Sequence, residues 1–187
     1  MISNGAMQIV ETTNDTVEAI VREHARLVYR IAYSVLRNHH DAEDATQETF
    51  LRVIRFRRKL EAVREDKAWL ARIAWRVAIQ KGKKSSEISI SVADVNAAIV
   101  QLQSQLPSAE ESALGKEMRV LLESLISALP GSLRDAIRLS TVEELTPGEM
   151  AHVLGTTESS VRSRIFRGRQ ILKQKLAELE GRYGTQR

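Results

Sequence analysis

Positive charge lies in two separate parts of this 187-residue chain, and an acidic stretch stands between them. Residues 1–84 hold 16 Lys and Arg against 11 Asp and Glu, and residues 116–187 hold 12 against nine. Residues 85–115 contain four acidic residues, seven Ser and no basic residue. This pattern favours two basic modules that engage a polyanion, joined by a flexible linker.

The chain has no cysteine and only three prolines. Without cysteine there is no disulfide framework, thiol nucleophile or thiolate metal site, and a reducing cytoplasm is the expected compartment. No apolar run approaches the roughly 20 residues that a membrane span requires. The first sixteen residues lack the features of a signal peptide, and we expect them to form a loose, disordered tail. Low Gly and Pro content favours an all-α fold.

Three helical patterns follow one another in the first basic segment, residues 17–84. Their apolar residues recur three, four or seven positions apart, which is typical of one helix face. The patterns cover residues 17–36, about 41–56 and 67–82. Asp41 is suited to cap the second helix, and Gly82 is expected to end the third. The first segment should therefore fold as a three-helix module.

The second basic segment, residues 116–187, ends in a helix-turn-helix pattern. Pro147 falls in the first turn of a short helix, and Gly155 ends it where positive φ is needed. Thr157 then caps a long last helix. Ala151, Gly155 four positions later and Val161 six further on have the residue types and spacing that two helices crossing at a steep angle require.

The last helix should present a basic face if Val161, Ile165 and Leu172 point into the core. Arg can pair with guanine and an exposed Phe can contact a thymine methyl, while other basic residues meet phosphates. An ordinary helical hairpin with a basic surface is the alternative interpretation. The candidate DNA contacts here are Ser160, Arg162, Ser163, Arg164, Phe166, Arg167 and Arg169.

Three stretches resemble one family in order and spacing. Residues 41–50, DAEDATQETF, are similar to the polymerase-binding helix of bacterial sigma factors, and residues 69–74, WLARIA, to their promoter-melting helix. Leu129-Pro130, TPGEMA at 146–151 and SVRSRIFRGR at 160–169 resemble the promoter-reading domain. The chain thus resembles the extracytoplasmic-function (ECF) group of the sigma-70 family. The resemblance implies a sigma-2-like domain at 17–84, an acidic linker at 85–115 and a sigma-4-like domain at 116–187.

The resemblance also implies partners: core RNA polymerase, promoter DNA and an anti-sigma factor. The core-polymerase contacts would come from Asp44, Gln47, Glu48 and Leu51, an acidic and aliphatic surface suited to a basic coiled coil. Recognition of the minus-ten element would use aromatic and basic residues that trap unpaired bases. Those candidates are Arg57, Arg58, Trp69, Arg72, Trp75 and Arg76.

Two details of the minus-ten segment qualify the resemblance. Trp69 lies on the apolar stripe, so of the two tryptophans it is the one expected in the core. The family pattern has an Asn and then an Asp after Ile73-Ala74, whereas this chain has Arg76 and Gln80. The base preference at the minus-ten element is therefore not predicted by the resemblance.

Two other function classes compete with transcription initiation. A stand-alone helix-turn-helix regulator would bind an operator without polymerase. A metal-dependent nuclease would need a cluster of ligands, and only His39, His40, Asp41, Glu43 and Asp44 suggest one. Neighbouring residues on one helix point in different directions, and no phosphate-binding glycine loop is present. We therefore expect no catalytic residue, no metal site and no cofactor.

Overall fold

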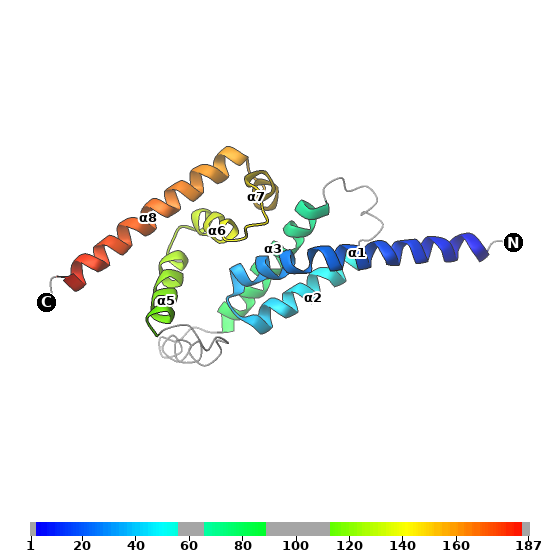
Figure 1. Cartoon of the computed structure of the whole chain (residues 1–187), viewed down its shortest axis with the longest axis horizontal. Helices are drawn as coiled ribbons and strands as arrows, with labels where there is room; N and C mark the ends of the chain where they lie inside the picture. The colour runs from blue at the N-terminus through cyan, green and yellow to red at the C-terminus, as the bar shows by residue number, and fades with distance from the viewer. Residues whose placement is uncertain (1–2, 56–65, 89–112, 185–187) are drawn as a thin grey trace.

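The computed structural model describes residues 3–55, 66–88 and 113–184, which form seven α-helices and no strand (Figure 1). The all-α prediction is confirmed for these residues. The first lobe consists of α1 (Ser3–Leu36), α2 (His39–Arg55) and α3 (Asp66–Ile88). The second lobe consists of α5 (Ala113–Ser127), α6 (Gly131–Ser140), α7 (Pro147–Leu154) and α8 (Glu158–Gly184). The predicted linker lies mostly outside the described residues.

The three helices of the first lobe pack against one another along their apolar faces. Val28 and Ile31 of α1 are fully buried, as are Val53 of α2 and Ala74 of α3. The buried face of α2 is made by small side chains and one threonine, whose hydroxyl donates to the carbonyl of Ala45 at 2.7 Å. Small residues allow the helices to approach closely, which fixes the orientation of the opposite, exposed face of α2.

The ends of these helices differ from the predicted ones. Helix α1 begins at Ser3, whereas the sequence predicted a loose tail up to residue 16. A helix extends readily from a packed turn because each added residue brings another hydrogen bond. The cap of α2 is Asn38, whose side-chain oxygen accepts from the backbone N–H of Asp41 at 3.0 Å, so the prediction of Asp41 as the cap was wrong. Arg37 precedes it with φ 54°.

Gly82 lies inside α3 and does not end it, contrary to the prediction. A Cβ atom at this position would meet the Leu36 side chain at 3.6 Å, an ordinary van der Waals distance, so α3 passes the end of α1 with room for a methyl group. The helix continues to Ile88, through the first four residues that the sequence had assigned to the linker.

The helix-turn-helix of the second lobe forms as predicted. Thr146 caps α7, because its hydroxyl accepts from the backbone N–H of Glu149 at 3.2 Å. The Glu149 carboxylate accepts in turn from the backbone N–H of Thr146 at 2.6 Å, and the two bonds form a capping box. Gly155 takes φ 62° between α7 and α8. Thr157 accepts from the N–H of Ser160 at 3.2 Å and caps α8. The second helix therefore leaves the turn in a fixed direction.

The two lobes pack against each other. Helix α3 contacts α7, and α1 contacts α6. A single cluster of buried residues includes side chains of both lobes, among them Leu70 of α3, Val142 and Met150. One apolar cluster therefore spans both lobes, with α7 placed against the helix predicted to meet the minus-ten element, and each lobe has a further cluster of its own.

Candidate DNA and protein interfaces

Helix α8 presents a basic and aromatic face to solvent. Val161 is fully buried and Leu172 is 8% exposed, and Ile165 is partly buried against the two clusters to which they belong. Phe166, on the opposite side, is 64% exposed, which is unusual for a large aromatic side chain in the middle of a helix. The predicted inward and outward faces of α8 are therefore those of the structure, and the outward face has the chemistry that base edges require.

The basic residues along α8 differ in their exposure to solvent and in the side chains that they contact. Arg162 and Arg167 are exposed, and Arg162 forms an ion pair with Glu158 one turn earlier at 2.5 Å. Arg164 is half-buried and donates to the Thr156 hydroxyl at 3.5 Å. Arg169 is exposed, whereas Ser160 and Ser163 are partly exposed. Arg167 can therefore reach a ligand directly, whereas Arg162 must first leave Glu158.

The minus-ten candidates are placed very differently. Trp75 is only 6% exposed and belongs to the buried cluster, whereas Trp69 is partly exposed and packs against that cluster. This reverses the expectation that Trp69 is the core tryptophan, and we remove Trp75 from the proposed DNA contacts. Arg76 is exposed and Arg72 partly exposed. Arg57 and Arg58 lie outside the described residues.

The exposed face of α2 carries the four predicted polymerase contacts. Positions 44, 47, 48 and 51 follow helical spacing, and Leu51 is 54% exposed. Ile54, one turn further, is 42% exposed and was not among the predicted contacts. The spacing from Leu51 was the signal that could have identified it. Two exposed aliphatic side chains beside acidic ones form a surface suited to another helix.

The acidic residues of this surface are paired within the lobe. Lys81 of α3 contacts Asp44 at 2.7 Å and Asp41 at 3.4 Å, and Glu48 accepts from Arg52 at 2.8 Å. The hydrogen bond and the charge of Lys81 lower the pKa of Asp44. Asp44 is therefore a carboxylate at neutral pH, available to a basic partner.

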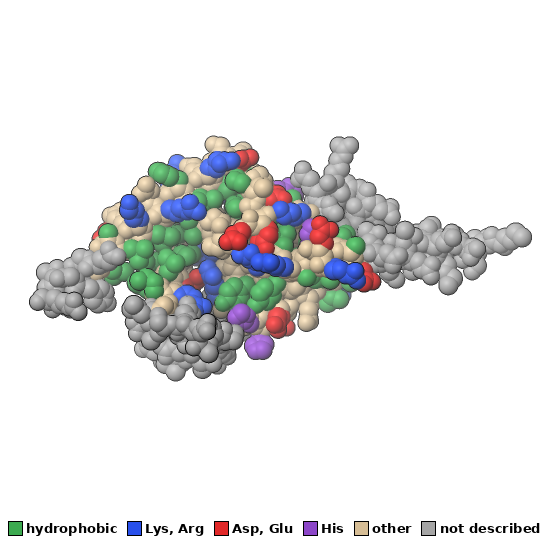
Figure 2. Space-filling model, viewed as in Figure 1, with side chains coloured by type: hydrophobic (Ala, Val, Ile, Leu, Met, Phe, Trp, Pro, Cys, Tyr) green, Lys and Arg blue, Asp and Glu red, His purple; other side chains and the backbone are tan. Residues whose placement is uncertain are grey.

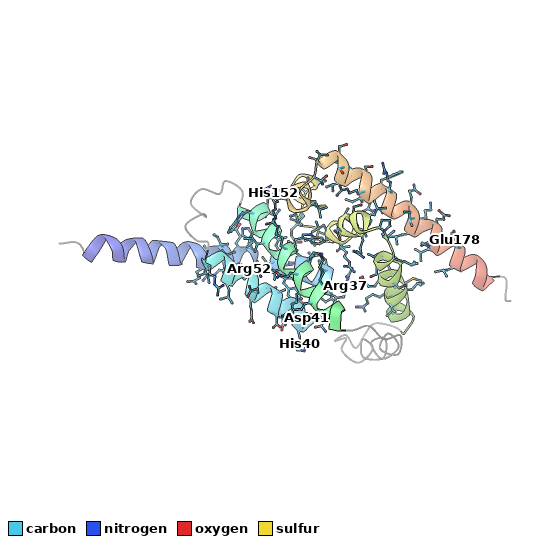
Figure 3. The ribbon with its side chains drawn as sticks, turned by 180° about the vertical axis from the view of Figure 1, so that it is seen from behind. Arg37, His40, Asp41, Arg52, His152 and Glu178 are labelled. Atoms are coloured by element: carbon cyan, nitrogen blue, oxygen red, sulfur yellow. The ribbon has the colours of Figure 1, made fainter. Side chains whose placement is uncertain are left out.

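No group of three or more His, Cys, Asp or Glu side chains is arranged to hold a metal among the residues that the structure describes. His39 instead shares a hydrogen bond of 2.5 Å with the Tyr29 hydroxyl, and its ring lies 4.8 Å from that of Tyr33. Figure 3 shows His40 and Asp41 beside one another at the same end of α2. These residues form a helix-end cluster of ordinary side-chain contacts.

Comparison with known proteins identifies the family. The family described as Sigma-70 region 2 matches residues 20–87, and that described as Sigma-70, region 4 matches residues 119–172. The chain is 30% identical over 159 residues to the ECF RNA polymerase sigma factor SigM of Bacillus subtilis, covering 84% of this chain and 93% of that one. The chain belongs to the ECF sigma factors of the sigma-70 family. The resemblance inferred from the sequence motifs is thus confirmed.

Two further relatives extend this comparison. The ECF sigma factor SigE of Mycolicibacterium smegmatis is 35% identical over 163 residues, or 86% of this chain, which spans 62% of that protein's length. The solved structure of CnrH in complex with the cytosolic domain of CnrY matches with a TM-score of 0.58 at 23% identity, covering 92% of this sigma factor and 95% of CnrH. At that identity the match shows a shared fold. No helix in the described ranges is long and apolar enough to cross a membrane.

Proposed function

We propose that this ECF sigma factor binds core RNA polymerase and directs it to promoters, where it supports initiation of transcription. The observation that carries this proposal is the pairing, in one chain, of an exposed acidic and aliphatic face on α2 with an exposed basic face on α8. The first suits a protein partner and the second suits DNA. A stand-alone regulator would not require the first face, so that alternative is not favoured.

The two faces divide the work between the lobes. The region from 17 to 84 would bind polymerase through Asp44, Gln47, Glu48 and Leu51, with Ile54 added from the structure. Within the same lobe, α3 would meet the minus-ten element through Trp69, Arg72 and Arg76, joined by Arg57 and Arg58. The region from 116 to 187 would read the minus-thirty-five element through α8, and the acidic stretch at 85–115 would connect the two.

The proposal also includes the partner that regulates the chain and the compartment in which it acts. The family is one of transcription factors rather than of enzymes, and we assign this chain no catalytic activity of its own. CnrH was solved with the cytosolic domain of CnrY, and the RpoE factor of Bartonella quintana with its anti-sigma factor NepR. We extend this kind of partner, and a cytoplasmic location, to the present chain by analogy.

The decisive experiment is transcription in vitro with purified core polymerase and a library of promoter sequences. Selective transcripts that depend on the added chain support the proposal. Tight binding of an operator by the chain alone, with no association with core polymerase, would instead support the stand-alone regulator. Cleavage of DNA by the chain with magnesium, abolished in Asp44→Ala, would support the nuclease.

Two variants separate the assigned faces. Glu48→Lys should prevent assembly with core polymerase because it places a cation where a basic partner is expected. Glu178→Lys makes the same charge change on an exposed side chain of α8 and should assemble normally. Co-migration with core polymerase on a native gel measures both. Normal assembly of the Glu48→Lys protein would contradict the docking assignment.

A further inference from the structure

The ion pairs that join the two lobes are all oriented in the same way. In each of the five that the structure gives between described residues, the first lobe supplies the cation and the second lobe supplies the carboxylate. The pairs are Arg26–Glu144 at 3.6 Å, Arg30–Glu143 at 3.7 Å, Arg30–Glu144 at 3.0 Å, Arg37–Glu123 at 2.8 Å and Lys67–Glu149 at 2.9 Å.

These carboxylates form one acidic edge of an otherwise basic lobe. Glu143 and Glu144 lie in the connection from α6 to α7, Glu149 lies in the first turn of α7, and Glu123 lies on α5. We call these four residues the acidic edge. Arg162, Arg167 and Arg169 of α8 are instead exposed to solvent. The second lobe is therefore bipolar, with a cationic reading face and an anionic face directed at the first lobe.

The contacts of the acidic edge are specific in geometry. The ammonium of Lys67 contacts both the Glu149 carboxylate and the backbone carbonyl of Glu144. Glu123 accepts from Arg37 of the first lobe and, at 2.9 Å, from Arg138 of its own lobe. Figure 3 shows Arg37 between the first lobe and α5, and in Figure 2 acidic and basic side chains lie against each other near the middle of the molecule.

The charges at this edge are retained although burial opposes them. Burial alone would raise the pKa of Glu149, but hydrogen bonds from the backbone of Thr146 and from Lys67 outweigh it and lower that pKa. Burial likewise opposes ionisation of Glu144, and its bonds from its own backbone N–H and from Arg30 lower the pKa below its ordinary value. Both groups are carboxylates at neutral pH, with the charge that a phosphate would also bring.

The arrangement in which the two lobes pack against each other, called the docked arrangement below, is incompatible with simultaneous reading of two promoter elements. Elements centred near minus ten and minus thirty-five lie about 25 base pairs apart, which is about 85 Å of duplex at 3.4 Å per pair. In the docked arrangement α7 lies against α3, and Lys67 at the start of α3 is already paired. If the proposed function holds, the lobes must separate before both elements are bound.

We propose that the acidic edge is a reversible self-mask: in the free protein it covers Arg30 and Lys67 of the first lobe, which otherwise bind the phosphate backbone of duplex DNA. Arg26 is paired at the border of this surface but stays 81% exposed. The masking contact needs no second protein, and duplex DNA competes with it for the same cations. Arg30 and Glu144 are each about 30% exposed, so salt reaches the pairs and weakens them. The mask therefore opens when a stronger polyanion or ionic strength displaces it.

The distance between the lobes tests the mask directly. Because the chain has no cysteine, one label can be placed on each lobe of the full chain through Glu23→Cys on α1 and Ser132→Cys on α6, both exposed positions. We expect a single short distance at low salt, which lengthens as NaCl is added and as a duplex of random sequence is added. A distance insensitive to both additions would overturn the proposal.

Charge exchange separates masking from general loss of structure. Arg30→Glu and Glu144→Arg should each open the labelled chain at low salt, and the double variant should restore the short distance because the pair is re-formed with opposite signs. Glu178→Arg, which adds the same charge away from the edge, should leave the distance unchanged. Failure of the double variant to close, in a protein with normal helix content, would count against a paired contact.

Binding of random-sequence duplex supplies the second readout. Glu144→Arg should bind such a duplex roughly tenfold more tightly than the parent, because it unmasks the phosphate surface. Glu178→Arg measures how much the added charge alone raises the affinity for this duplex. An equal rise in affinity in Glu144→Arg and Glu178→Arg would refute the mask. Neither assay contains polymerase. If the lobes open and close as expected but the chain never assembles with core polymerase, only the proposed function is refuted. If the chain assembles with core polymerase but the lobes do not open as expected, only the mask is refuted.

Discussion

The two helices assigned to DNA differ in how ready they are to bind it. Helix α8 leaves Phe166 64% exposed on a basic face, whereas α3 has Trp75 at 6% exposed and packs against α7 of the other lobe. Within one chain, the α8 face proposed to read DNA is open to solvent, whereas α3, proposed to meet the minus-ten element, packs against the other lobe on one side and keeps Arg76 exposed on another. If the proposed roles hold, recognition at minus thirty-five needs no rearrangement of its lobe, whereas the contact between α3 and α7 must be released for both elements to be bound at once.

The largest effect that would sharpen this contrast comes from the two aromatic residues. Trp75→Ala should lower the free energy of unfolding by about 3–5 kcal/mol because it empties a buried site. Phe166→Ala should change stability by less than about 0.5 kcal/mol, because the ring is exposed, yet reduce transcription from minus-thirty-five-dependent promoters. Chemical denaturation and transcription in vitro measure the two properties. A stable Trp75→Ala protein would break the distinction between the helices.

Glycine substitutions provide a second comparison, with opposite signs in the two lobes. A Cβ at Gly168 of α8 would lie 2.7 Å from the Ile137 side chain of α6, so Gly168→Ala should destabilise the second lobe by about 1–3 kcal/mol. At Gly82 of α3 the nearest atom is 3.6 Å away and the residue is helical, so Gly82→Ala should stabilise the first lobe by about 0.5–1 kcal/mol. Thermal unfolding followed by circular dichroism measures both. A loss at Gly82 equal to that at Gly168 would contradict the assigned packing.

A third effect concerns base contacts on the open face. Arg167→Ala should weaken minus-thirty-five-dependent transcription by the equivalent of about 1–3 kcal/mol if the guanidinium reads a base, while assembly with core polymerase is unchanged. Arg22→Ala is the matched control, since it also removes an exposed Arg, one whose ion pair is with Glu18 in the same helix. Equal promoter use by the two variants would show that the outward face of α8 is not the reading face.

Local signals predicted the second lobe better than the first. Thr146, Pro147 and Gly155 specify a cap, a first turn and a left-handed residue whatever surrounds them, and the structure has all three features. The burial of Trp75 depends on which helices pack around it, which periodicity along one helix cannot reveal. The cap of α2 was misassigned because Asn38 and Asp41 are both good capping residues, and only the backbone path decides between them.

The acidic edge could not be predicted from charge counts. Residues 116–187 are basic overall, and four of their nine acidic residues are paired with the first lobe. Their alignment depends on three elements of the second lobe meeting two helices of the first, a relation between segments far apart in sequence. By contrast, the exposed face of α2 follows from spacing within one helix, and Ile54 is the exposed residue that the predicted contacts did not include.

The smallest expected effect is the pH dependence of lobe docking. Because the pKa values of Glu144 and Glu149 are lowered in the docked structure, their contribution is fully present above the ordinary glutamate pKa of about 4.3 and is lost as pH falls through the lowered values. Arg26, Arg30 and Lys67 are the cations that face them. Asp135 acts in the opposite direction, because burial raises its pKa and protonation relieves that cost.

Acidification should therefore open the doubly labelled chain slightly before the helices unfold, by less than about 1 kcal/mol for each partly exposed pair. The distance between labels and the helix signal, recorded together across the acidic range, separate opening from unfolding. Glu144→Gln should weaken docking at neutral pH and reduce its pH dependence, whereas Asp135→Asn should leave the acid-induced opening in place. If the lobes opened instead as pH rose, ionisation of Asp135 rather than the acidic edge would govern the contact between them. The packing of α3 against α7 would then not be explained by the ion pairs of the acidic edge.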